Sequence, residues 1–270
     1  EMSTRVFETT FRTACASGNN NAIFQTGNLL QALEDGDEAL IQEVHGGTKG
    51  TAACVSRVVS PDIAIITNIV PNHMSQIGTM ENLIEAKLGI IDGLKPDGVL
   101  ILCDDNEHLR NVNPPVRTIR YSLTDVNAHY HVENIKEEGE TVSFEIVSRE
   151  SEFDQAGRYP AKLYTRGVHN VSNALAVFAA GRQAGIPPYK IVAGLSRYRT
   201  TGIRQNLFDH NGIKVLMDAY NSNPKALLAM FDVFDQLQPE EDGRKILVLG
   251  MMGEQGDDSL QIHYETGKAI

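Results

Sequence analysis

A lysine in an apolar setting is the feature of this sequence that most strongly indicates chemistry. The segment 79–94 carries apolar residues at the three- and four-residue spacing of one buried helix face, and Lys87 falls on that face. The apolar positions are Met80, Leu83, Ile84, Ile91 and Leu94. A lysine there extends its stem to solvent, pairs with an acid or is chemically modified, and for a lone lysine the first outcome is the commonest. The neighbouring residues therefore decide how Lys87 is to be interpreted.

Polar residues follow the apolar segment just upstream of that helix. Residues 63–69 form a nearly continuous β-branched run, which predicts a parallel strand covered on both faces. Thr67, Asn68, Asn72 and His73 lie at its carboxyl end. In open α/β sheets ligands bind outside the carboxyl ends of the strands, so this position favours chemistry over packing.

Two further predicted strands end in acidic residues. Residues 38–44 end with Glu43, and residues 98–105 end with Asp104 and Asp105. Acids and a histidine that converge on one edge of a sheet predict a cation site. Oxygen ligands with one imidazole suit magnesium or manganese better than zinc, which prefers more nitrogen and sulfur ligands.

Composition limits the class of protein. The chain has 270 residues, of which 41% are hydrophobic, enough for one large domain or two smaller ones. Its net charge of -11 comes from 24 basic and 35 acidic residues, and no Lys/Arg cluster is present to neutralise nucleic-acid phosphates. No apolar run approaches the ~18 residues of a membrane span, and no signal peptide is present. We therefore expect no nucleic-acid or membrane partner, whereas a nucleotide remains compatible with the charge.

The three cysteines are scattered. Cys15, Cys54 and Cys103 form no CxxC pair and lie in apolar sequence surroundings, so we expect reduced core residues of a cytoplasmic protein and no metal site among them.

Strand-like and helical segments alternate along the chain, which predicts an α/β fold with a mostly parallel central sheet flanked by helices. Period-two runs between residues 130 and 163, joined by the acidic turn KEEGE, predict a small antiparallel hairpin region. The other predicted helices are residues 1–16, 29–33, 51–59, 170–184 and 188–195.

The segment SRYRTTGIRQ, residues 196–205, has the basic and glycine-containing composition of a linker. After it the sequence predicts two buried strands, one ending at Asp218 and the other at Gly250. We expect residues 1–197 to form one α/β domain and residues 206–270 to be the incomplete start of a Rossmann-like domain.

Four segments resemble the Mur ligase family, in the order and roughly the spacing of that family. They are TNIVPNHMSQIGTMENLIEAK, GVHNVSNALAVFAAG, LMDAYNSNPKALLAM and ILVLGMMGEQGDDSLQIHYETG. Together they run through almost the whole chain, so this resemblance is far more specific than any single motif.

The resemblance implies an ATP-dependent carboxylate–amine ligase of peptidoglycan precursor synthesis. ATP phosphorylates the terminal carboxylate of a UDP-linked muramoyl peptide. An amine, either D-alanyl-D-alanine or another amino acid or dipeptide, then attacks the acyl phosphate, with release of ADP and phosphate. The resemblance thus implies ATP and Mg²⁺ as cofactors, small molecules as partners, and a cytoplasmic protein that we expect to be a monomer.

The same resemblance assigns roles by motif. Glu43 and His73 resemble magnesium ligands, and Lys87 resembles the lysine that the family carbamylates, which would explain its inward position. The further matches are Asn173 and Asn19 with adenine, Arg204 with the ATP phosphates, Asp218 with the ribose or a phosphate, and Asn221 and Asn223 with the incoming dipeptide.

One family feature is absent from the sequence. The glycine-rich phosphate loop GxxGK[ST] does not occur in these 270 residues. Residues 1–16 resemble the helix that follows this loop, so we expect the loop and the UDP-binding domain upstream, the rest of the C-terminal domain downstream, and no turnover by this segment alone.

Four alternatives to a ligase of peptidoglycan synthesis are considered. A non-catalytic Mur-like binding protein would have lost the phosphate loop, but retention of Glu43, His73, Lys87, Arg204 and Asp218 together argues against it. Folylpolyglutamate synthase and cyanophycin synthetase are rival enzymes of the same kind. The MurT-type amidotransferase partner carries a four-cysteine zinc insertion, which three scattered cysteines cannot supply.

Overall fold

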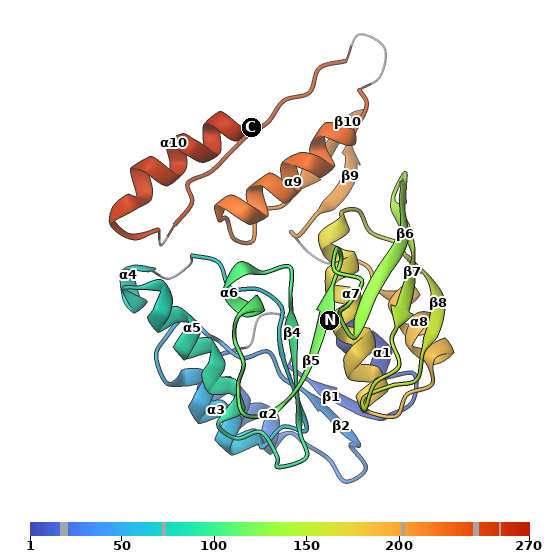
Figure 1. The fold of residues 1–270 in the computed structure, drawn as a ribbon. Helices are drawn as coiled ribbons and strands as arrows, with labels where there is room; N and C mark the ends of the chain where they lie inside the picture. Colours follow the sequence, from blue (N-terminus) through green and yellow to red (C-terminus); the bar gives the residue numbers. More distant parts are fainter. Residues whose placement is uncertain (17–20, 72–73, 201–202, 240–242, 254) are drawn as a thin grey trace.

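The computed structural model describes residues 1–16, 21–71, 74–200, 203–239, 243–253 and 255–270. A six-stranded sheet in the order β3-β4-β5-β6-β7-β8 forms its centre (Figure 1). The fold class is α/β, with a mainly parallel sheet flanked by helices and a small antiparallel region, as predicted.

The parallel part of the sheet contains β3 (Ile63–Ile66), β4 (Val99–Cys103) and β5 (Arg117–Ser122). Every residue of β4 is buried, at 4% exposure or less, because β4 lies between two neighbouring strands with layers on both faces. The sequence predicted β3 and β4 but missed β5.

The antiparallel part is continuous with the parallel part. It contains β6 (Tyr130–Glu138), β7 (Thr141–Ser148) and β8 (Gly157–Leu163), which confirms the predicted antiparallel hairpin region. Strand β6 also pairs in parallel with β5, through Tyr121 opposite Tyr130 and Ser122 opposite His131. This second pairing, which the sequence did not predict, makes one sheet of the two regions.

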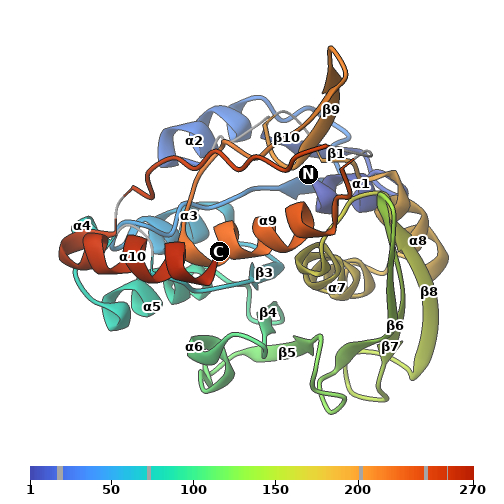
Figure 2. The same ribbon diagram turned by 90° about the horizontal axis from the view of Figure 1, so that it is seen from above.

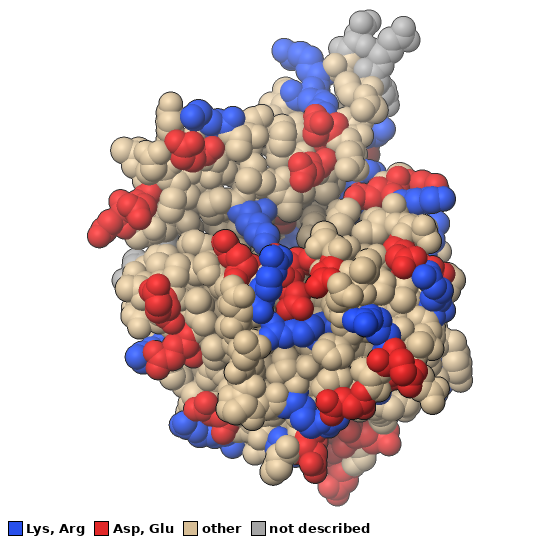
Figure 3. Space-filling model, in the orientation of Figure 1, with Lys and Arg blue, Asp and Glu red and all other residues tan. Residues whose placement is uncertain are grey.

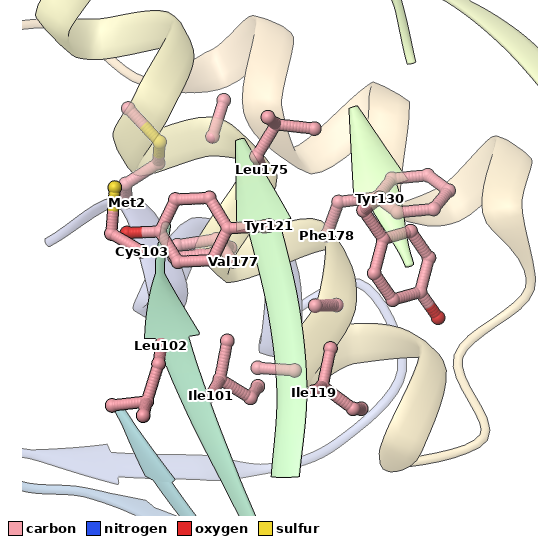
Figure 4. Close-up of a cluster of buried hydrophobic side chains, with 14 of the residues drawn as sticks. Met2, Ile101, Leu102, Cys103, Ile119, Tyr121, Tyr130, Leu175, Val177 and Phe178 are labelled. Atoms are coloured by element: carbon pink, nitrogen blue, oxygen red, sulfur yellow. The ribbon is translucent and has the colours of Figure 1, made fainter. Parts of the chain in front are cut away.

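The sheet bends around helix α7 (Val168–Gln183), which contacts strands β3 to β7 (Figure 2). Helix α8 (Pro188–Arg197) contacts β8, and α1 (Met2–Phe7) packs on both α7 and α8. The core lies beneath α7, where the rings of Tyr130 and Phe178 meet edge to face with centroids 5.8 Å apart (Figure 4).

The helix that carries Lys87 is fixed at both ends. Helix α5 (Met80–Leu88) starts at Thr79, whose side chain accepts a hydrogen bond from the backbone N–H of Asn82, and it continues into the 3-10 helix η1 (Gly89–Ile91). Helix α3 (Thr51–Val59) then approaches so closely that a Cβ on Gly93 would lie 2.1 Å from the carbonyl oxygen of Ser56. Only glycine allows this contact, which holds the end of the Lys87 helix against α3.

The N-terminal region differs from the prediction. Residues 1–16 are not one helix, because only Met2–Phe7 are helical and Thr13–Cys15 form strand β1. Strand β1 pairs in parallel with β2 (Ala39–Ile41) in a separate two-stranded sheet. Pairing with β2 overrides the helical pattern of the sequence, and it places the segment before Glu43 outside the sheet of β3, contrary to the prediction. The other helices of this half are α2 (Ile23–Gln31), α4 (Met74–Ile77) and α6 (Glu107–Arg110).

The C-terminal region contains β9 (Asn206–His210), β10 (Ile213–Met217), α9 (Pro224–Gln236), the 3-10 helix η2 (Gly256–Asp258) and α10 (Ser259–Ala269). The two predicted buried strands are wrong in different ways. Strand β10 forms but pairs with β9 as a partly exposed hairpin, and residues 244–250 are not a strand, with Val248 88% exposed. A strand needs a hydrogen-bonded neighbour, and within the described residues none lies beside 244–250.

The structure also bears on the cysteines and on the length of the helices. Of the three cysteines, which are all free, only Cys103 is buried, whereas Cys15 and Cys54 are exposed rather than in the core. In the described part of the chain, no helix combines the length and apolar character needed to cross a membrane.

Candidate functional site

A cavity of about 1650 Å³ brings together residues from distant parts of the chain. Its wall includes Glu43 after β2, Lys87 on α5, Asn173 on α7, Arg204 before β9 and Tyr220 after β10. These residues are spread over positions 43 to 220 of the sequence, so the cavity is a product of the fold rather than of one motif. It is the natural candidate for a ligand site.

Lys87 is half-buried in this cavity, where it faces an acid. Burial lowers the pKa of the Lys87 amine, and the negative charge of Glu43 acts in the opposite direction. Glu43 is itself oriented by Asn21, whose Nδ2 donates to Glu43 Oε1 at 3.0 Å. Lys87 and Glu43 thus combine a desolvated amine with a carboxylate that a hydrogen bond from Asn21 orients.

The two walls next to this pair come from the central sheet and α7. Thr67 and Asn68, at the carboxyl end of β3, line the cavity together with Asn173 on the half-buried side of α7. Amide and hydroxyl groups at a strand end suit recognition of a nucleotide's polar edges.

Arg204 reaches the cavity from the segment that joins α8 to β9. Its guanidinium carbon lies 3.8 Å above the centre of the Tyr220 ring, a cation–π contact that holds the side chain over the cavity wall. Nearby, the backbone N–H of Gln205 donates to Asp218 Oδ1 at 3.3 Å. Partial burial raises the pKa of Asp218, while the Gln205 N–H and the charge of Arg204 oppose that shift.

A partly buried histidine, His169, links α7 to the same segment. Gln205 Nε2 lies 3.0 Å and Asn170 Nδ2 lies 3.1 Å from His169 Nε2. Because amide nitrogens only donate, His169 Nε2 is an acceptor and the ring is neutral. Burial lowers the pKa of His169, and the charge of Asp218 acts against this.

Other predicted site residues lie elsewhere. Asp104 pairs with Arg120 at 2.8 Å, and Asp105 accepts from the backbone N–H of Leu123 at 2.7 Å. Both acids therefore make local contacts around β5, and neither lines the cavity with Glu43 and Lys87. His73 and Asn19 lie outside the described residues. Within the described ranges, no cluster of three or more His, Cys, Asp or Glu side chains could hold a metal ion.

The predicted dipeptide contacts have local partners. Asn223 Oδ1 accepts from the backbone N–H of Ala226 at 2.9 Å and caps α9, and Asn221 Oδ1 accepts from the N–H of Ser222 at 2.8 Å. Three predicted site residues that the structure describes do not line the cavity, namely Asp218, Asn221 and Asn223.

Sequence reasoning missed several contributors. Asn21 is one of a run of asparagines, Tyr220 is a single aromatic residue, and Gly46 carries no functional group. His169 belongs to the segment GVHNVSN, of which only the asparagines were predicted to have a role. Only the resemblance of that segment to a family motif offered a signal for His169.

On the face shown in Figure 3, acidic and basic side chains are interleaved, and several of each gather near its centre.

Comparison with known families defines the class of protein. Residues 1–181 match the Mur ligase middle domain, and residues 203–270 match the Mur ligase, glutamate ligase domain. The chain belongs to the Mur ligase family.

The curated relatives indicate a particular member of that family. The chain is 35% identical over 271 residues to the UDP-N-acetylmuramoyl-tripeptide--D-alanyl-D-alanine ligase of Bacillus subtilis, which covers 100% of this chain and 57% of the relative. It is 29% identical to the ligase of the same name from Haemophilus influenzae, over 94% of this chain and 53% of that protein. The chain thus spans little more than half the length of these relatives.

Solved structures share the fold. MurF from Acinetobacter baumannii superposes with a TM-score of 0.88 at 24% identity, covering 99% of this chain and 57% of that one. The MurF ligase from Thermotoga maritima in complex with ADP gives a TM-score of 0.84 at 22% identity, covering 99% and 60%.

Proposed function

We propose that this chain is the ATP-binding part of a ligase that adds D-alanyl-D-alanine to a UDP-N-acetylmuramoyl tripeptide in peptidoglycan synthesis. The observation that carries the proposal is Lys87, which is half-buried beside Glu43 in a cavity that Arg204 and Asn173 also line. The 35% identity to the Bacillus subtilis ligase, which extends over the whole of this chain, supports the choice of substrates.

The proposed reaction places ATP in the cavity. The γ-phosphoryl group passes to the terminal carboxylate of the muramoyl peptide, ADP leaves, and the amine of the dipeptide attacks the acyl phosphate and releases phosphate. Negative charge develops on phosphoryl oxygens in both steps, so positioned cations contribute most of the rate enhancement. Arg204 is suited to this role because a side chain stacked on Tyr220 at the cavity wall can contact phosphates without entering the core.

The remaining assignments follow the same site. Asn173 and Asn19 are proposed adenine contacts, Asp218 a contact of the ribose or a phosphate, and Asn221 and Asn223 contacts of the dipeptide. Asn221 and Asn223 use their side-chain oxygens in local hydrogen bonds, so a substrate contact would involve their amide nitrogens.

The donor set fits Mg²⁺ if Lys87 is carbamylated. A free ammonium beside a metal ion would be repelled by it, whereas a carbamate supplies the oxygen ligands that magnesium prefers. A lowered pKa favours the neutral amine, which is the form that reacts with carbon dioxide. Glu43 and carbamylated Lys87, with His73, would then hold the ion, which neutralises phosphoryl charge when bound.

Free cysteines suit a reducing compartment, so we also propose a cytoplasmic location.

An amine panel tests the proposed function. The intact protein, given ATP, Mg²⁺ and the UDP-muramoyl tripeptide, should release ADP rapidly with D-alanyl-D-alanine and slowly with glutamate or single D-alanine. In a parallel assay with a folate acceptor, stimulation of ADP release by glutamate would instead indicate an enzyme of the folylpolyglutamate synthase type. ADP release that no amine stimulates would contradict ligase function.

A further inference from the structure

A glycine lies against the side chain of Lys87. Gly46 is partly buried in the segment that follows β2, and a Cβ built on it would lie 2.9 Å from Lys87 Cγ and 3.2 Å from Lys87 Nζ. The shorter distance is closer than carbon atoms approach in folded proteins, so any larger residue at 46 would displace the lysine.

Backbone conformation does not explain this glycine. Gly46 is absent from the glycines with positive φ, so its torsion angles are open to other residues. The space that Lys87 occupies is what requires the missing side chain.

The lysine cannot yield at low cost. The atom nearest to the added Cβ is Lys87 Cγ, which lies close to the helix backbone. Removing the clash therefore requires rotation about the first side-chain bond of the lysine, and this rotation also moves the amine. The backbone of α5 is held in place by Leu83 and Ala86, which are 0% and 3% exposed. A shift of the whole helix would therefore disturb the core.

The same short segment sets both the position and the charge environment of the amine. Burial lowers the pKa of Lys87, and the charge of Glu43, three residues before Gly46, opposes that shift. Glu43 is oriented by Asn21. Gly46 lies against the lysine stem.

We propose that Gly46 is a positioning residue that directs the Lys87 amine into the cavity. The consequence for catalysis rests on the proposed ligase function, whereas the contact itself is independent of it. A Cβ at position 46 turns the amine away from Glu43 and so removes the arrangement that the reaction needs.

A double-mutant cycle tests the contact in the intact protein. Gly46→Ala should lower Tm by roughly 2–4 °C, the effect of about 1 kcal/mol in a protein of this size. In the Lys87→Ala background the same change should leave Tm unaltered, because the clashing side chain is gone. Gly27→Ala is the matched control, since a Cβ at Gly27 meets nothing within 4 Å, and it should not lower Tm in either background.

The cycle separates positioning from a general folding role. Equal losses of Tm from Gly46→Ala in both backgrounds, or no loss in either, would overturn the proposal. If Gly46→Ala is too unstable to purify alone, recovery of folded protein in the Lys87→Ala background supports the contact, and failure there overturns it.

Two functional measurements complete the test. Gly46→Ala should reduce kcat roughly 10²-fold, as expected when a reacting group is misplaced by about 1 Å, with the KM for ATP unchanged. Acetylation of Lys87, measured by mass spectrometry against Lys136 in the same protein, should change several-fold, and an unchanged ratio would contradict the proposal. A wild-type protein without ligase activity would refute the proposed function but leave the stability cycle and the acetylation result interpretable.

Discussion

At the scale of single residues, the site depends on a lysine that is held between a carboxylate and a glycine. Helical periodicity alone predicted that Lys87 faces inward, because spacing determines which side of a helix a residue occupies. Periodicity could not predict Gly46, since a residue without a side chain leaves no pattern. Glu43 was predicted at the site for a partly wrong reason, because β2 pairs with β1 instead of joining the sheet of β3.

Replacing the lysine by arginine tests its chemistry. Lys87→Arg keeps the positive charge but cannot form a carbamate, so ligation should fall roughly 10²- to 10³-fold, the scale of losing one group that stabilises the transition state. Isotope-labelled bicarbonate should give a carbamate carbon resonance in the wild type that is absent in the variant.

Lys136→Arg is the control, because Lys136 is exposed on β6, away from the cavity. It should keep wild-type activity and the carbamate signal. Full activity of Lys87→Arg would eliminate carbamylation as a requirement.

At the scale of elements, local pattern and pairing partner contribute differently. Helix α3 has the predicted bounds, because its pattern and its packing agree. Residues 13–15 and 244–250 depart from prediction, since strand formation is decided by a partner elsewhere in the chain. The contact between α7 and the segment before β9 was equally hidden, because His169 and Gln205 meet only after folding.

Acid should weaken the contact between α7 and that segment. Burial lowers the pKa of His169 below its unfolded value of about 6.5, so the unfolded state binds the proton more readily. The stability that neutral His169 contributes is present above about pH 6.5 and is lost as the pH falls toward the folded pKa. Tm of the wild type should therefore fall more steeply between about pH 7.5 and 5.5 than Tm of His169→Gln.

His210→Gln is the matched control, because His210 is exposed on β9. Its pH dependence should parallel that of the wild type. Parallel curves for His169→Gln as well would show that this histidine does not carry the effect.

At the scale of the whole molecule, we propose that the chain divides at residues 198–205. The six-stranded sheet, α1, α7 and α8 all lie before this point, and they pack mainly on one another. Among the described residues, few contacts cross the division, and one of them joins Lys225 Nζ to Asn68 Oδ1 at 3.5 Å. The sequence indicated this division through the composition of the linker.

A chain of residues 1–197 should fold alone. It keeps the complete core, so thermal unfolding followed by circular dichroism should show one cooperative transition. A chain that ends at residue 163 lacks α7 and should show none. A non-cooperative 1–197 chain would contradict the division.

The central claim is that this cavity supports transfer of a phosphoryl group from ATP to a carboxylate, followed by attack of an amine. Isotope transfer tests it most directly. The intact protein is given ATP, D-alanyl-D-alanine and a UDP-muramoyl tripeptide whose terminal carboxylate carries heavy oxygen. We predict that the inorganic phosphate released with the product contains one heavy oxygen atom from that carboxylate. This oxygen bridges carbon and phosphorus in the acyl phosphate, and it leaves with the phosphate when attack of the amine breaks the carbon–oxygen bond. Phosphate without the label, released together with amide product, would contradict the account.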